Sequence, residues 1–309
     1  MASKPPGDIP IDPGFARRLQ DVYGEDRATR WLQGLPGLVT RLADAWGLAL
    51  ESPYSSLTYS WVAPGHDASG APVALKLTVP SSHLATEAAA LEAYAGEGAV
   101  RLLRADLDAG ALLLERAVPG DPLLVLDDDS AATEAAIQVM QRLRRPPPAA
   151  SSFPALRDWA RAFERHRQRF GGTAGPLPRD LVAKAEDTFY NLLAQPTAQV
   201  LLHGDLHHRN ILRSQREGWL AIDPEGVIGE PEYEVAAFMR NPFPHLLAQP
   251  SRGRILRNRL AQLASELGFD RERLRAWSFA HAVLSAVWAI EDHGAGWEYS
   301  IEVARLLRT

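Results

Sequence analysis

The chain has 309 residues, of which 46% are hydrophobic and 23% are charged, and these proportions are those of an ordinary folded globular protein. This length exceeds the usual size of a single core, so we expect two lobes. The formal net charge of −5 argues against a broad surface that binds nucleic acid and is compatible with a cationic ligand. The absence of cysteine excludes disulfide scaffolds, thiolate zinc sites and cysteine nucleophiles.

The amino terminus and the apolar runs bear on where the protein acts. Residues 1–15, MASKPPGDIPIDPGF, lack a basic segment followed by an apolar one, so we expect no signal peptide. No uninterrupted apolar run in the sequence approaches the ~18–20 residues that cross a bilayer. We therefore expect a cytoplasmic monomer with no membrane and no nucleic-acid partner.

The first part of the chain, residues 1–118, combines strands with helices. Its first fifteen residues contain several prolines and glycines, which predicts an extended arm. Residues 25–46 follow with helical spacing, and Gly34 and Pro36 are expected to bend or divide that helix. The remaining predicted elements are a hairpin of strands over 57–62 and 72–77, a helix over 83–96 capped by residues 80–82, and strands over 100–106 and 111–117.

From residue 119 onward the periodicity is almost wholly helical, which predicts a second, larger lobe over residues 119–309. The fold class is therefore α+β, with a small antiparallel sheet lobe that carries one main helix and a larger, mainly helical lobe. The predicted helices of the second lobe cover residues 130–144, 154–170, 178–193, 232–239, 251–268, 270–291 and 297–307.

Residues 201–225, LLHGDLHHRNILRSQREGWLAIDPE, hold three polar side chains at the edges of apolar runs. Gly204 suits a sharp turn after the first run, which would push Asp205 out of the core. Asn210 precedes the second run and Asp223 ends the third, so a hairpin between these runs would place Asn210 and Asp223 together. Oxygen ligands of this kind suit Mg²⁺, and phosphoryl transfer depends on such positioning and charge neutralisation.

Other interpretations of this stretch are weaker. Each of the three polar residues, taken singly, could be a turn residue or a helix cap. His203, His207 and His208 could suggest a metal site with Asp205, but zinc-type spacing is absent, which favours structural roles for these histidines. Neither G-x-x-x-x-G-K-[ST] nor G-x-S-x-G occurs, so a P-loop kinase is excluded and a serine hydrolase is unsupported.

At these residues the chain resembles the aminoglycoside phosphotransferases, which share the protein-kinase-like fold. HGDL at 203–206, with Asn210, is similar to their catalytic loop, and IDPE at 222–225 stands where that fold has its metal-binding Asp. The closer match is to streptomycin 6-phosphotransferases and hydroxyurea-resistance kinases, through LLHGDLHHRNIL, WLAIDPEGVIGEPEYEVAAFMRNP, and SWVAP followed by VALKL. The resemblance covers nearly the whole chain.

The resemblance implies an enzyme that binds ATP and Mg²⁺ in a cleft between the two lobes. Asp205 would be the catalytic base that accepts the proton of the acceptor hydroxyl. Asn210 and Asp223 would hold Mg²⁺ on the phosphates of the nucleotide. In this family the acceptor is a small molecule, and the favoured acceptor is the 6-hydroxyl of streptomycin.

The resemblance also implies that Lys76, on the strand VALKL, binds the phosphates and that Glu87, on the next helix, is its ion-pair partner. The residues themselves support a pair, because a lysine on a short apolar strand needs a neutralising partner. Glu92 is the second choice of partner. In isolation, Lys76 could instead extend from a half-exposed strand into solvent.

The remaining nucleotide contacts are less well marked in the sequence. The turn at residues 54–57 contains no glycine, so its phosphate contacts would come from backbone N–H groups and the hydroxyls of Ser55 and Ser56. The segment between the lobes would read the adenine edge through the backbone of Glu115 and Ala117.

Several carboxylates near the proposed site could bind a cationic acceptor. A solvated acidic face is the ordinary explanation for such a segment. Alternatively, because streptomycin carries guanidinium groups, carboxylates that line the cleft would pair with them. The candidates are Glu225, Glu230, Glu232 and Glu234 after the motif, and Glu291 and Asp292 near the carboxyl terminus.

Two further functions stay open from the sequence. The first is a kinase for another small acceptor, such as hydroxyurea or a metabolite, because the phosphate machinery does not encode the acceptor. The second is a catalytically silent nucleotide-binding pseudokinase. The presence of Lys76, Asp205, Asn210 and Asp223 together weighs against the second.

Overall fold

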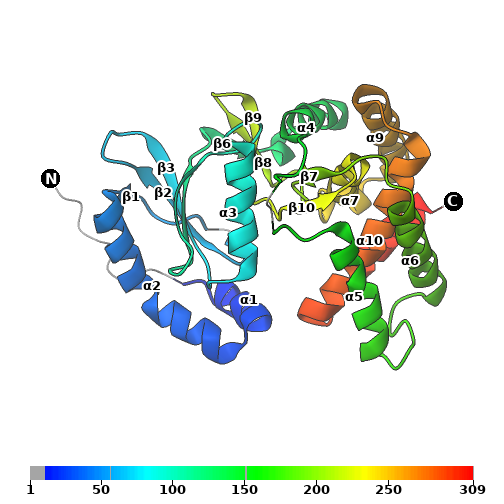
Figure 1. Cartoon of the computed structure of the whole chain (residues 1–309), viewed down its shortest axis with the longest axis horizontal. Helices are drawn as coiled ribbons and strands as arrows, with labels where there is room; N and C mark the ends of the chain where they lie inside the picture. Colours follow the sequence, from blue (N-terminus) through cyan, green and yellow to red (C-terminus); the bar gives the residue numbers. More distant parts are fainter. Residues whose placement is uncertain (1–10, 56, 150–151, 309) are drawn as a thin grey trace. The chain divides into compact units, whose positions relative to one another are not determined.

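The computed structural model describes residues 11–55, 57–149 and 152–308. The chain divides into two compact units (Figure 1). The first unit comprises Met1–Gly96 and Val100–Val118, and the second comprises Glu97–Ala99 and Pro119–Thr309. Each unit has its own core, and we describe them in turn.

The first unit is built on an antiparallel sheet of five strands in the order β1-β2-β3-β5-β4. Strand β3 lies at the centre, so both of its backbone edges are paired with neighbouring strands, β2 and β5. Within it, Lys76 pairs with Val62 of β2 and with Leu112 of β5. The strands are β1 (Ala49–Leu50), β2 (Trp61–His66), β3 (Pro72–Leu77), β4 (Leu102–Asp106) and β5 (Ala111–Glu115).

Helix α3 (Ser82–Tyr94) follows β3 and packs beside β4. The Ser81 side chain caps it by accepting a hydrogen bond from the Leu84 N–H at 3.5 Å. The helix ends at Ala95, which adopts a left-handed conformation with φ 50°. The strands and the capped helix predicted for this part of the chain are present, although β2 begins four residues later than predicted.

Two helices precede the sheet, and here the structure corrects the sequence interpretation. An extended arm was predicted for residues 1–15; residues 1–10 lie outside the described residues, and helix α1 (Pro13–Tyr23) already begins within the arm. The Asp12 carboxylate accepts the Phe15 N–H at 2.9 Å, and Pro13 occupies a first-turn position where no N–H is needed. Pro13, predicted to belong to an extended arm, therefore marks the start of a helix.

Helix α2 (Glu25–Trp46) runs without interruption through Pro36, which was expected to bend or divide it. Its buried face carries Leu35, Val39 and Leu42, each at most 1% exposed. Burial of this apolar face against the sheet outweighs the loss of the one backbone hydrogen bond that proline cannot donate. The core that α1 and α2 share with the sheet includes Trp61 and Leu75.

The second unit is mainly helical, and α10 lies at its centre. This helix packs against α5, α6, α7, α9 and α11 (Figure 1). Its Trp277 is fully buried, with its ring 4.9 Å from Phe189 and 5.1 Å from Tyr233. The helices are α4 (Asp129–Leu143), α5 (Leu156–Arg169), α6 (Arg179–Ala194), α7 (Val235–Arg240), α8 (His245–Ala248), α9 (Arg252–Leu267), α10 (Arg271–His293) and α11 (Glu298–Leu307).

Short strands in the second unit carry the loops that matter for the site. Strand β7 (Val200–Leu202) pairs with β10 (Val227–Gly229), and β8 (Ile211–Ser214) lies between β6 (Pro119–Pro122) and β9 (Gly218–Ala221). A single helix was predicted over residues 232–239. The structure instead has a 3-10 turn, η2 (Pro231–Glu234), that leads into α7; a second 3-10 turn, η1 (Leu123–Val125), follows β6.

A search of the described residues for a helix long and apolar enough to span a membrane finds none.

The buried position of Leu75 on the central strand gives a test of the first unit. Leu75 is 0% exposed, whereas Leu103 on β4 is 44% exposed. We expect Leu75→Ala to lower the free energy of unfolding by about 2–5 kcal/mol, because it removes transfer energy and leaves a cavity. Leu103→Ala should change it by no more than about 0.5 kcal/mol. Urea unfolding measures both, and equal losses would contradict the assigned register.

Candidate active site

Asp205 lies in the tight turn that follows strand β7. Gly204 makes the turn with φ 87°, a conformation that disfavours any side chain. A Cβ on Gly204 would also lie 2.7 Å from the Trp159 ring of α5. The turn leaves the Asp205 side chain 37% exposed, while Leu202 before it and Leu206 after it are buried. The predicted projection of Asp205 out of the core is therefore what the structure shows.

His203 fixes this turn from inside the core. Its Nε2 lies 2.8 Å from the Ile222 carbonyl, and its Nδ1 lies 3.3 Å from the Asp205 N–H. Because a carbonyl only accepts, Nε2 donates and Nδ1 accepts, which is the pattern of a neutral ring. Burial lowers the pKa of His203 and so favours this neutral form. His203 thus has a structural role, and a search of the described residues for metal-binding clusters of acidic, histidine or cysteine side chains finds none.

Asn210 and Asp223 are brought together by the β8–β9 hairpin. Ile211 pairs with Ala221, and the Ile222 N–H donates to the Asn210 carbonyl at 2.9 Å, so the ladder continues to the residue before Asp223. The Asn210 Nδ2 donates to the Asp205 backbone carbonyl at 3.0 Å. Asn210 is consequently linked through its side chain to the Asp205 turn and through its backbone to Ile222, the residue before Asp223.

Asp223 has an unusual backbone. Its φ of 57° is left-handed, which an Asp tolerates better than most residues with a side chain. Its side chain is exposed. With Nδ2 of Asn210 engaged to Asp205, the Oδ1 of Asn210 is the atom of that carboxamide able to bind a cation. An amide oxygen and a carboxylate at adjacent hairpin ends form a hard-oxygen donor set that fits Mg²⁺.

Glu234, at the end of η2, ties the turn to the helical core. Its carboxylate accepts the backbone N–H of His203 at 2.7 Å and that of Gly204 at 3.0 Å. Burial raises the pKa of the Glu234 carboxyl to about 7, against the two amide hydrogen bonds, which lower it. Glu234 was predicted to belong to a carboxylate-rich face, solvated or lining the cleft. The structure assigns it to the loop instead.

Arg259 of α9 is a further support that the sequence analysis missed. It is 1% exposed, and its Nε lies 3.0 and 3.1 Å from the two carboxylate oxygens of Asp129. It also donates to the carbonyls of Phe238 and Asn241, at the end of α7, and to Nε2 of His208 at 3.3 Å. A buried arginine that contacts three elements distant in sequence gives no local pattern by which to find it.

His208 completes this support. It stacks on the Phe238 ring at 4.3 Å, and the Arg259 guanidinium lies over the same ring at 4.7 Å. Since arginine only donates, the His208 Nε2 accepts and Nδ1 carries the proton. Burial lowers the pKa of His208 well below its usual value, and the positive charge of Arg259 adds to that effect. His208 is therefore a neutral structural residue of the loop.

Glu230 and Glu232 do not line an open surface, contrary to one of the predictions for them. Glu230 is 1% exposed and forms a two-pronged ion pair with Arg273, whose Nε lies 2.7 Å from Oε2. Glu232 is 5% exposed and accepts the Thr197 hydroxyl at 2.9 Å. Because protein groups already occupy these carboxylates, we correct their assignment from substrate contacts to structural residues.

The other predicted substrate residues differ among themselves. Glu291 of α10 receives a two-pronged contact from the Arg165 guanidinium of α5, with both distances 3.0 Å. Its charge is thereby neutralised within the unit. Glu225 and Asp292 are exposed, and Glu225 lies two residues beyond Asp223. Contact of Glu225 and Asp292 with a cationic substrate stays a prediction.

In the first unit, Lys76 and Glu87 form the predicted ion pair. The lysine Nζ lies 2.7 Å from both carboxylate oxygens, and the two side chains are 8% and 10% exposed. Glu92, the second choice of partner, is exposed on α3. A pair this deeply buried fixes both side chains, because each ion would otherwise be left uncompensated.

Of the other residues predicted to contact adenine and the phosphates, Ser55, Glu115 and Ala117 lie within the described residues. Ser55 is exposed, and Ser56 lies outside the described residues. The Glu115 N–H donates to the Arg101 carbonyl at 2.9 Å, so an adenine contact there would fall to the Glu115 carbonyl. Ala117 is buried at 7% exposure.

The arrangement defines a class of protein. A solved structure of the aminoglycoside phosphotransferase APH(4)-Ia, in a ternary complex with ADP and hygromycin B, matches with a TM-score of 0.60 and 15% sequence identity. The match covers 87% of this chain and 98% of that one. Together with the sheet unit, the helical unit and the loop at Asp205, this similarity confirms the expected protein-kinase-like fold of the small-molecule phosphotransferases.

The family is defined more closely by sequence. The profile of the aminoglycoside/hydroxyurea antibiotic resistance kinases matches residues 50–293. A streptomycin 6-kinase of Streptomyces glaucescens is 31% identical over 301 residues, which cover 97% of this chain and 96% of the relative. A hydroxyurea phosphotransferase of Kitasatospora aureofaciens is 34% identical over 278 residues, 89% of this chain and 78% of that protein. The chain belongs to this family of phosphotransferases, as its motifs predicted.

Because Glu230 is a buried ion-pair partner, replacing it with the similarly shaped glutamine should destabilise the protein. We expect Glu230→Gln to lower the free energy of unfolding by about 3–5 kcal/mol, because Arg273 would lose its buried partner. The matched control is Glu302→Gln. Glu302 pairs with Arg305 on the surface, where the two side chains are 54% and 55% exposed, so this variant should lose at most about 1 kcal/mol of unfolding free energy. Urea unfolding measures both. An unchanged stability for Glu230→Gln would contradict the structural role of Glu230.

The raised pKa of Glu234 predicts a dependence of stability on pH. Between its ordinary pKa of 4.5 and its folded value of about 7, the folded protein holds a proton that the unfolded chain has released. The stability due to this group is therefore full below pH 4.5 and is lost as the pH rises through 7.

Glu234→Gln should remove that part of the slope, roughly 2–3 kcal/mol between pH 5 and pH 8. Urea unfolding of both proteins across this range checks it. Parallel curves for variant and wild type would show that Glu234 titrates normally.

Proposed function

We propose that this protein transfers the γ-phosphate of ATP, with Mg²⁺, to a hydroxyl of a small molecule. The observation that carries the proposal is the position of the Asp205 carboxylate, which is partly exposed on a turn that Glu234, His203 and Asn210 hold rigidly. A fixed and accessible carboxylate beside a hard-oxygen donor pair suits phosphoryl transfer, since that reaction depends on positioning and charge neutralisation.

In this mechanism Asp205 orients the acceptor hydroxyl and accepts its proton as the oxygen attacks phosphorus. Asn210, through Oδ1, and Asp223, through its carboxylate, would hold Mg²⁺. The ion would supply the positive charge that offsets the charge developing on the transferred phosphoryl group.

The first unit would bind the nucleotide. Lys76, fixed by Glu87, would contact its phosphates, and the backbone of Glu115 and Ala117 would contact the adenine. Ser55 and Ser56 would contribute further phosphate contacts. The bidentate Lys76–Glu87 pair supports this role, because it holds the ammonium group in one position within a short apolar strand.

For the acceptor we propose streptomycin, at its 6-hydroxyl. The support is the 31% identity to the streptomycin 6-kinase of S. glaucescens over nearly the whole of both chains. The carboxylates of Glu225 and Asp292 would pair with the guanidinium groups of this cationic substrate. Hydroxyurea is the second candidate, because the K. aureofaciens hydroxyurea phosphotransferase is 34% identical.

The test is transfer of labelled phosphate from ATP by the pure protein to streptomycin, hydroxyurea and a panel of other small alcohols. We expect Mg²⁺-dependent transfer to streptomycin, and a loss of at least about 100-fold in kcat for Asp205→Ala, because the positioned base is removed. The affinity for ATP should change little.

Asp187→Ala is the matched control, because Asp187 is exposed on α6 and has no part in the proposed site. Transfer to hydroxyurea alone would replace the acceptor and keep the mechanism. Binding of ATP without transfer to any acceptor would show a nucleotide-binding module instead.

A further inference from the structure

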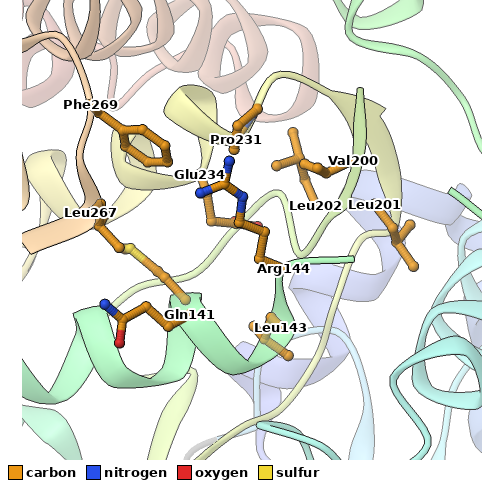
Figure 2. Close-up of a pocket in the computed structure, with 11 residues that line it drawn as sticks. Gln141, Leu143, Arg144, Val200, Leu201, Leu202, Pro231, Glu234, Leu267 and Phe269 are labelled. Carbon is orange, nitrogen blue, oxygen red and sulfur yellow. The ribbon is translucent and has the colours of Figure 1, made fainter. Parts of the chain in front are cut away.

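A small cavity in the second unit is lined by the end of α4, strand β7, η2 and the residues at the end of α9 (Figure 2). It has a volume of about 130 Å³ and is partly open to solvent. Its walls are mostly apolar, and engineered cavities of ~150 Å³ with such walls bind a single aromatic ring. The apolar lining includes Met140, Leu143, Val200, Leu202, Leu267 and Phe269.

Two charged residues line the same cavity. Arg144, directly after α4, is exposed, and its guanidinium lies over the Phe269 ring at 5.3 Å. Figure 2 shows its side chain extending toward Pro231, with Glu234 beside it. No ion pair joins Arg144 to any acidic group within the described ranges. The cavity thus offers an apolar body with one cation at its rim, and the buried carboxyl of Glu234 forms part of its wall.

Glu234 connects this cavity to the turn. It lines the cavity with a side chain that is almost fully buried, and its carboxylate holds the amides of His203 and Gly204. Leu202, another lining residue, directly precedes His203 on the chain. An occupant would therefore contact both the strand that enters the turn and the side chain that fastens it.

We propose that this cavity is an effector site for a small aryl carboxylate, whose ring fills the apolar walls and whose carboxylate pairs with Arg144. None of the residues proposed to bind ATP, Mg²⁺ or the acceptor lines this cavity. Only the expectation that its occupant affects catalysis through the Asp205 turn rests on the proposed function. Because the occupant contacts β7 and Glu234 in the arrangement seen here, it stabilises the hydrogen bonds that the His203 and Gly204 amides donate to Glu234.

The probes are benzoate, benzamide as its uncharged analogue, and acetate as the head group without a ring. Calorimetric titration should show saturable binding of benzoate, with benzamide and acetate each at least about tenfold weaker. Arg144→Met keeps the aliphatic stem and should weaken benzoate at least about tenfold. The matched control, Arg257→Met, removes an exposed arginine of α9 that does not line the cavity, and should bind as the wild type does.

Coupling to the turn is measured by amide hydrogen exchange, which needs no turnover. At a benzoate concentration of ten times its Kd, exchange at His203 and Gly204 should slow about tenfold, because opening must release the ligand. Amides of β2 and β3 serve as the internal control and should not change. Absence of saturable binding, equal binding by Arg144→Met, or unchanged exchange at residues 203 and 204 each overturns the proposal.

Discussion

The carboxylate of Glu234 is the group on which the geometry of the site depends. The turn that carries Asp205 has left its sheet and has no strand partner of its own, so its amide groups need acceptors within the core. Glu234 supplies two acceptor oxygens to adjacent residues, and η2 carries it to the position where they are needed. The buried Glu234 carboxyl thus holds the turn that presents the partly exposed Asp205 carboxylate.

The buried Arg259 gives the same loop a second attachment, and the partly buried Arg273 fixes the segment that leads into η2. Arg259 draws together the start of α4, the end of α7 and His208, and Arg273 joins α10 to Glu230. All three nitrogens of the Arg259 guanidinium have hydrogen-bond partners, which is the condition under which a buried charge is tolerated. The helices are thereby arranged around fixed charges as well as around the aromatic core at Trp277.

The sequence allowed the loop to be predicted because its residues are close along the chain. Asp205, Asn210 and Asp223 span a strand, a turn and a hairpin, and the periodicity of those elements places them together. Local spacing and turn chemistry carry this information. Lys76 and Glu87 were predicted from the resemblance to the phosphotransferase family, and the need of a lysine on an apolar strand for a partner supported the pair.

The carboxylates after Asp223 could not be assigned in that way. An acidic segment has the same composition whether it faces solvent, a substrate or a buried arginine, and Arg273 lies more than forty residues from Glu230. Similarly, the prolines near the amino terminus suit an extended arm or the first turn of a helix, and only packing of Phe15 and Leu19 decides for α1. Contacts that are distant in sequence determine these cases.

The close approach of Gly204 to Trp159 bears on how this enzyme can diversify. A glycine that is confined by both its backbone angle and a neighbouring ring leaves no room for substitution in the turn. A change of acceptor preference would then have to come from residues outside the turn, because a side chain at position 204 would displace Asp205 as well.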